Sequence, residues 1–96
     1  MNQLSWCVYI LQCGDGSLYT GITNRLQVRL ASHKLGQGAK YTRSHLPVKL
    51  VYVEPQLSRS SSLQREAMIK KLPRLEKLKL VAKDFGLGSE FFGLIN

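Results

Sequence analysis

The hydrophobic and polar positions of the 96-residue chain predict short strands and helices in alternation. Residues 6–12 are rich in β-branched and aromatic side chains, and residues 17–23 repeat this pattern. Between them, glycine and aspartate at residues 14–16 favour a tight reversal of the chain. We therefore predict that the two segments pair as a β-hairpin.

The next segment has the spacing of a helix followed by a loop. Asn24 is suited to cap a helix over residues 25–35, and glycines follow at its end. The face expected to turn inward carries Leu26, Leu30 and Ala31. Residues 37–47 are polar and are predicted to form a loop.

The second half of the chain predicts one more strand and two helices. The strand spans residues 48–53 and is closed by Pro55. One helix covers residues 58–72, with Ser61 or Ser62 near its start, and another follows Pro73 to Lys83. The side chains expected to face the core are Leu63, Ala67 and Met68 in the first of these helices, and Leu75 and Leu78 in the second, with Val81 and Ala82 as further candidates.

The element order ββαβα, with a third helix, predicts a single α+β domain over residues 1–83. Residues 84–96 form an apolar, glycine-spaced tail. Three placements stay open for this tail: docking on the core, pairing with a second subunit through Phe91, Phe92 and Ile95, or fraying. The oligomeric state is therefore left open.

Charge is distributed unevenly along the chain. Residues 1–24 contain no lysine or arginine, whereas residues 25–83 hold all fourteen basic residues and three acidic ones, a net charge of +11. This favours a polyanion partner, nucleic acid above all, over a merely solvated basic surface. No apolar run approaches the ~20 residues of a membrane span, and no secretory leader is visible. Cys7 and Cys13 have neither disulfide nor zinc spacing, so we expect a reduced, cytoplasmic protein.

Two tyrosines of the predicted hairpin are candidates for chemistry. If Leu11 pairs with Tyr19, then Tyr9 lies opposite Gly21, and both phenols project from one face beside the space that glycine leaves. A slip of one residue would separate them. The alternative is that both are ordinary half-buried sheet aromatics.

Three further residues have suitable chemistry but also simpler explanations. Arg29 and His33 are neighbours at helical spacing, and could bind phosphate and transfer a proton, or belong to a solvated basic face. Glu66 is a scarce carboxylate in a basic region and could bind one divalent cation, or pair with Lys70.

In this order, Tyr9, the Tyr19-Thr20-Gly21 triplet, Arg29, His33 and Glu66 resemble the GIY-YIG nuclease family. The chain is similar to the small, single-domain bacterial members over about residues 6–82. Cys7 stands where that family has its first glycine, and Ile22 stands where some relatives have a lysine. The resemblance implies a three-stranded antiparallel sheet flanked by helices and metal-dependent hydrolysis of phosphodiesters.

The resemblance also implies a role for each residue. Glu66 would hold one Mg²⁺ or Mn²⁺, and Arg29 would neutralise phosphoryl charge. One tyrosine would deprotonate the attacking water while the other orients it; we favour Tyr9, assisted by His33, with Arg29 and the metal lowering the phenol pKa.

The predicted enzyme is an endonuclease that is weakly sequence-specific or selective for structure, and its expected partner is nucleic acid, DNA before RNA. The alternative is a basic module that binds nucleic acid without cleaving it. The side chains predicted to contact the nucleic acid are Arg25, Lys40, Arg43, Lys70 and Lys71.

Overall fold

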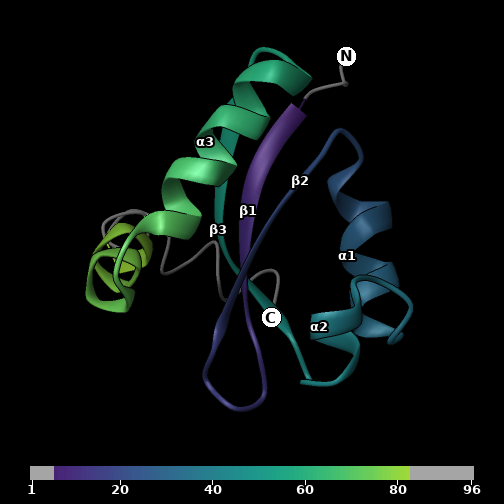
Figure 1. Cartoon of the computed structure of the whole chain (residues 1–96). Coiled ribbons are helices and arrows are strands. Elements are labelled where there is room, and N and C mark those ends of the chain that lie inside the picture. The colour runs from purple at the N-terminus through teal and green to yellow at the C-terminus, as the bar shows by residue number, and fades with distance from the viewer. Residues whose placement is uncertain (1–5, 83–96) are drawn as a thin grey trace.

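The computed structural model describes residues 6–82, in which three strands form one antiparallel sheet (Figure 1). Strand β1 spans Trp6–Gln12, β2 spans Leu18–Thr23 and β3 spans Lys49–Gln56. Their order is β2-β1-β3, so the first strand is central. The predicted α+β class and the antiparallel three-stranded sheet are confirmed.

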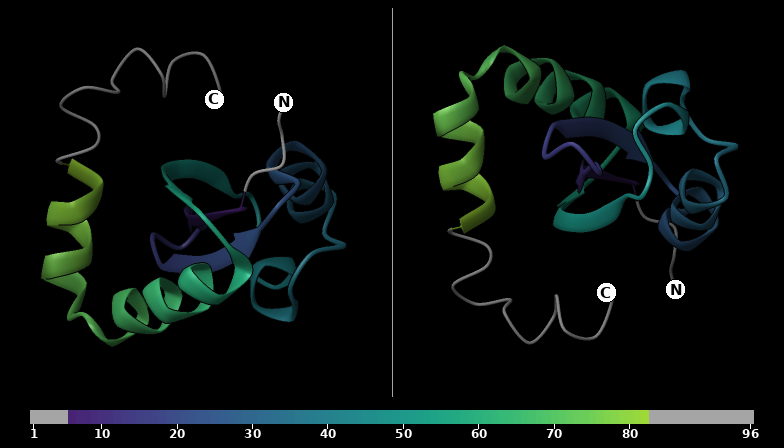
Figure 2. Two further views of the ribbon diagram at one scale, coloured as in Figure 1. Left: turned by 90° about the horizontal axis from the view of Figure 1, so that it is seen from above. Right: turned by 90° about the horizontal axis from the view of Figure 1, so that it is seen from below.

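Helices lie on both sides of the sheet (Figure 2). Helix α1 spans Leu26–Lys34, α2 is a single turn at Lys40–Arg43, and α3 spans Arg59–Lys71. Residues 74–82 are also helical. The predicted tail at 84–96, with its proposed contact residues, lies outside the described part of the chain. Within that described part, no helix is long and apolar enough to cross a membrane.

The register of the hairpin is the one that brings the two tyrosines together. Leu11 pairs with Tyr19, and Tyr9 pairs with Gly21. Because side chains alternate between faces with a period of two, this pairing puts both phenols on the same face of the sheet.

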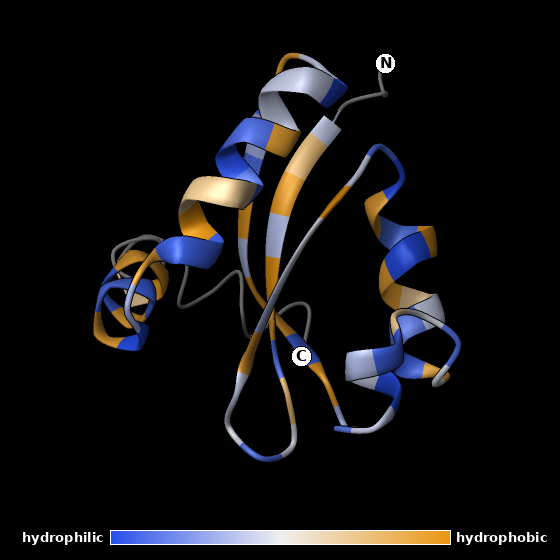
Figure 3. Ribbon diagram, viewed as in Figure 1, coloured by the Kyte–Doolittle hydropathy of each residue, from blue (hydrophilic) through white to orange (hydrophobic). Residues whose placement is uncertain are grey.

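The central strand is buried on both of its faces, which explains its continuous apolar sequence. Val8 and Ile10 pack with Ile69 of α3, whereas Tyr9 and Leu11 pack on the face that Leu26 and Leu30 of α1 cover. Figure 3 shows the resulting hydrophobic colouring along β1, beside helices of mixed character. The sheet therefore separates an α3 face from an α1 face.

The inward faces of the helices differ from the sequence prediction. In α3 the buried residues are Ser62 and Ile69, whereas Met68 is 59% exposed. Ser62 lies seven residues before Ile69, and its hydroxyl donates to the Ser58 carbonyl oxygen, so a small polar residue occupies the face next to the sheet. The expected inward residues that are instead exposed are Leu63, Ala67, Leu75, Leu78, Ala82 and Ala31; Val81 packs on the core as expected, together with Leu80.

Several predicted boundaries were also wrong. The side chain of Asn24 does not cap α1; Thr23 Oγ1 accepts from the Arg25 N–H just before the helix. Pro55 does not close β3 but pairs with Cys7 inside it, which an edge strand tolerates. The loop at 37–47 contains α2.

Candidate active site

Four of the five predicted catalytic residues meet on the α1 face of the sheet. Tyr9 comes from β1, Tyr19 from β2, and Arg29 and His33 from α1. Tyr9 Oη lies 2.9 Å from His33 Nε2. The ring centroid of Tyr19 lies 6.4 Å from that of Tyr9 and 5.3 Å from that of His33. Residues far apart in sequence thus form one polar cluster inside an otherwise apolar layer.

Gly21 provides the space that the two phenols occupy. A Cβ atom at this position would lie 2.6 Å from Tyr9 Oη, 2.7 Å from Tyr9 Cζ and 3.1 Å from Tyr19 Cε2. Distances of this kind are well inside van der Waals contact, so a side chain here would force the rings to move. Glycine at position 21 is therefore required by the packing of the candidate site.

We expect Gly21→Ala to destabilise the fold by about 1–3 kcal/mol and to slow any reaction that depends on the tyrosines, because the added methyl overpacks their cluster. Urea unfolding measures the first effect. Wild-type stability and wild-type ring contacts in the variant would contradict this account of the packing.

A second hydrogen bond holds the far side of the His33 ring. His33 Nδ1 lies 2.7 Å from Thr42 Oγ1, and the Thr42 hydroxyl donates to the Ala39 carbonyl oxygen at 3.0 Å. A Cβ atom on Gly38 would lie 2.4 Å from His33 Nδ1. The one-turn helix α2 and the preceding glycine therefore enclose the imidazole. The sequence pattern assigned no role to Gly38 or Thr42, since both lie in a segment predicted only as a polar loop.

Burial controls the protonation of the Tyr9 phenol. Desolvation raises the pKa of Tyr9 to about 12, although the nearby Arg29 guanidinium acts to lower it. Arg29 alone therefore does not depress the pKa of this phenol below its ordinary value. Tyr9 is a neutral phenol at neutral pH, and any role as a base requires its own proton to leave as it accepts another.

His33 is placed to accept that proton. Its side chain is fully buried, and desolvation together with repulsion from Arg29 lowers the pKa of His33 to about 4. The ring is thus neutral at pH 7, with one nitrogen available as an acceptor.

This buried histidine should make the fold sensitive to mild acid. Its folded pKa of about 4 lies below the ordinary value of 6.5. Between these two pH values the unfolded chain binds a proton that the folded chain does not. We expect the free energy of unfolding to be highest above pH 6.5 and to fall as the pH drops towards 4. Denaturant unfolding measured across this pH range tests the expectation. His33→Gln should remove the contribution of this histidine to the slope of the unfolding free energy against pH. Equal slopes in both proteins would contradict it.

Glu66 lies on α3, on the opposite face of the sheet from the cluster. Its carboxylate is 3.3 Å from Lys70 Nζ, the simple ion pair kept as an alternative above. Arg65, the preceding residue, pairs with Glu54 of β3 at 2.9 Å. Successive residues point about 100° apart around a helix. Ser62 and Ile69 mark the side of α3 that faces the sheet, and Arg65 and Glu66 lie on either side of that direction. Because Arg65 contacts β3, the helical geometry points Glu66 towards the other flank of α3, away from β3.

The five predicted contacts to nucleic acid are all on exposed residues, namely Arg25, Lys40, Arg43, Lys70 and Lys71. Lys40 and Arg43 belong to α2, next to the His33 ring, whereas Lys70 and Lys71 end α3. Basic side chains therefore lie on both sides of the edge strand β2.

Tyr41 continues the aromatic group towards the surface. Its ring stacks on His45 with centroids 4.1 Å apart, and it lies nearly parallel to Tyr19 at 6.4 Å. Its hydroxyl donates to Ser17 Oγ at 2.7 Å. These contacts connect α2 to the hairpin and hold the outer side of Tyr19.

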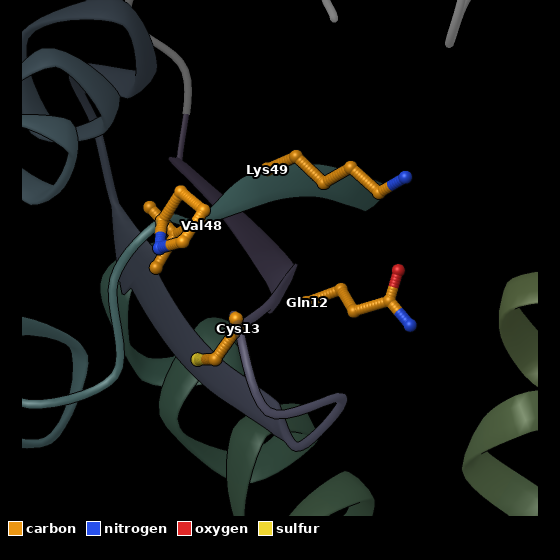
Figure 4. Close-up of a pocket in the computed structure, with 6 residues that line it drawn as sticks. Gln12, Cys13, Val48 and Lys49 are labelled. Atoms are coloured by element: carbon orange, nitrogen blue, oxygen red, sulfur yellow. The ribbon is translucent and has the colours of Figure 1, made fainter.

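A pocket of about 270 Å³ lies beyond the end of β1 (Figure 4). In the close-up, Gln12 and Lys49 extend to the same side, away from the Cys13 thiol. The pocket contains none of the catalytic candidates, so it is not the site described above. Its lining residues are Gln12, Cys13, Gly14, Pro47, Val48 and Lys49.

Comparison with known proteins shows the family to which the chain belongs. The family model described as the GIY-YIG catalytic domain matches residues 5–79. The chain therefore belongs to the GIY-YIG family, a family of nucleases.

Its relatives place it more narrowly, among the UPF0213 proteins. It is 54% identical to a UPF0213 protein of Oceanobacillus iheyensis over 77% of this chain and 86% of that one. A UPF0213 protein of Natronomonas pharaonis is 49% identical over 82% of this chain and 93% of that one.

Two solution NMR structures resemble the fold. A protein from E. faecalis superposes with a TM-score of 0.60 at 41% identity, covering 90% of this chain and 91% of that one. A UPF0213 protein from Bacillus halodurans superposes with a TM-score of 0.54 at 40% identity, covering 82% and 84%.

Proposed function

We propose that this protein is a metal-dependent endonuclease that hydrolyses phosphodiester bonds of nucleic acid, with DNA as the expected substrate, and is weakly sequence-specific or selective for nucleic-acid structure. The observation that carries the proposal is the hydrogen bond between the phenol of Tyr9 and Nε2 of the buried His33, beside Arg29. A phenol, a neutral imidazole and a fixed cation are the groups that activation of water at a phosphate requires.

In this reaction two protons move together, and the net result is the transfer of one proton from water to His33. The attacking water gives a proton to Tyr9 Oη as the Tyr9 hydroxyl proton passes to His33 Nε2. The raised pKa of Tyr9 makes this relay more favourable than a standing phenolate. Tyr19, the half-buried tyrosine of the cluster, orients the water.

Arg29 stabilises the charge that grows on the phosphoryl oxygens. A bound phosphate also offsets the repulsion that Arg29 exerts on an imidazolium, so it raises the pKa of His33 when the proton must be accepted. Together with burial, the Arg29 guanidinium therefore keeps His33 neutral before substrate binds, and with a phosphate bound to Arg29 the imidazole can accept the proton.

The described residues offer few ligands to a divalent cation. The described residues contain no group of three His, Cys, Asp or Glu side chains able to hold a metal. Glu66, whose side chain is 18% exposed, provides one carboxylate, which suits an ion that keeps several waters and completes its shell with substrate phosphate. When bound, Mg²⁺ or Mn²⁺ would stabilise the leaving oxygen.

The experiment that tests the proposal is a cleavage panel with the purified chain. Duplex, branched and single-stranded DNA and an RNA are incubated with Mg²⁺, Mn²⁺ or EDTA, and binding is measured in parallel. We expect metal-dependent products from at least one substrate. Salt-sensitive binding without any product would favour the alternative, a basic module that binds but does not cleave.

A further inference from the structure

The imidazole of His33 connects two hydroxyl groups in a buried chain. Tyr9 Oη lies 2.9 Å from Nε2, and Thr42 Oγ1 lies 2.7 Å from Nδ1. Tyr9 is 1% exposed, and His33 and Thr42 are both 0% exposed. We infer that Thr42 is a positioning residue that keeps the proton of neutral His33 on Nδ1, so that Nε2 is bare and faces the phenol of Tyr9. Its catalytic consequence rests on the proposed function, but the proton's location does not.

The direction of these hydrogen bonds follows from counting protons. A threonine hydroxyl has one proton, and Thr42 donates it to the carbonyl oxygen of Ala39 at 3.0 Å. Its oxygen can therefore only accept from His33, which requires a proton on Nδ1. A neutral imidazole has one N–H, so Nε2 must accept the proton of the Tyr9 hydroxyl.

The backbone around Thr42 holds this arrangement in place. Thr42 belongs to α2, where the Arg43 N–H donates to the Ala39 carbonyl at 3.0 Å, so the same carbonyl serves both the turn and the threonine. Gly38 lies against the ring beside Nδ1, where a Cβ atom would come within 2.7 Å of Cγ. This close approach and the two hydrogen bonds hold the imidazole in one orientation, in which its two nitrogens have distinct partners.

This orientation gives the proton relay a defined direction. The proton of Tyr9 moves to Nε2, which yields an imidazolium that still donates from Nδ1 to Thr42. With the proton on Nε2 instead, the ring could only donate to Tyr9 Oη and could not accept from it. A hydroxyl on Thr42 thus decides whether His33 accepts a proton from the phenol or opposes its release.

The test combines a spectroscopic measurement with a cleavage rate. Nitrogen-15 NMR of the His33 ring distinguishes a bare nitrogen from an N–H, and it needs neither substrate nor metal. In the wild type we expect the bare nitrogen to be Nε2. Thr42→Val keeps the shape but removes the acceptor, and it should lose this preference and slow cleavage roughly 10- to 100-fold, the typical effect of removing a hydrogen bond that orients a functional histidine.

Two variants separate this role from simple packing. Thr42→Ser retains the hydroxyl and should restore both the Nδ1–H signal and the rate. Thr20→Val makes the same change at a buried threonine of β2 outside the cluster, and it should alter neither. An Nε2–H signal in the wild type, or an unchanged signal and rate in Thr42→Val, would overturn the inference. The predicted signals in a protein that cleaves nothing would support the inference while rejecting the proposed function.

Discussion

Replacing Tyr9 with phenylalanine should slow cleavage by about 10²–10⁴-fold, the range over which positioned acid–base groups act. The variant loses only the hydroxyl that lies 2.9 Å from His33 Nε2, while the ring stays to fill its place in the core. Nucleic-acid binding should be nearly unchanged, because Tyr9 is buried and carries no charge. Single-turnover rates at saturating protein measure the effect on chemistry alone.

Tyr52→Phe is the matched control for this variant. Tyr52 is also a buried phenol with a pKa raised to about 12 by desolvation, but it hydrogen-bonds Glu54 on the opposite face. The Tyr52→Phe variant should leave the rate unchanged.

Tyr19→Phe then discriminates between the two site tyrosines. If it is the slower variant and Tyr9→Phe is nearly normal, the assignment of Tyr9 as the proton acceptor is wrong.

Arg29→Met should slow cleavage by about 10²–10³-fold, the typical loss when one preorganised stabilising group is removed from a site of developing charge. Methionine retains much of the apolar stem of arginine, so packing on α1 changes little. The rate should fall on every substrate, because phosphoryl oxygens are common to all of them.

A second readout of the same variant does not depend on cleavage. Repulsion from Arg29 contributes to the low pKa of His33, so Arg29→Met should raise that pKa. NMR titration of the ring measures the shift. Lys34→Met removes an exposed charge near the end of the same helix and should alter neither quantity. An unchanged rate and an unchanged His33 titration in Arg29→Met would contradict the proposed role.

The part of the site that could be predicted from sequence depends on local geometry. A strand alternates its faces every residue, so the pairing of Tyr9 with Gly21 was enough to place both tyrosines together. Arg29 and His33 are one helical turn apart, and this spacing made them neighbours on α1 whatever α1 packed against.

The parts that could not be predicted depend on contacts between distant segments. The role of Thr42 arises because α2 folds back over α1, and nothing in its neighbouring residues indicates a hydrogen bond to His33. The side of α3 that faces the sheet carries Ser62 and Ile69. One of these residues is polar and the other apolar, so a search for evenly spaced hydrophobic residues does not identify this side. Burial of Tyr9 likewise comes from the assembled core, so the sequence indicated the charge of Arg29 but not the desolvation that outweighs it.

The most direct test of metal-dependent hydrolysis compares two glutamates that are both paired with lysines along helical turns. Glu66 lies 3.3 Å from Lys70, and Glu76 lies 3.4 Å from Lys79. Single-turnover cleavage is measured for Glu66→Gln and Glu76→Gln while Mg²⁺ is varied. We predict that Glu66→Gln loses cleavage or needs far more Mg²⁺, with nucleic-acid binding retained, and that Glu76→Gln matches the wild type. Equal, metal-independent rates in all three proteins would contradict the account.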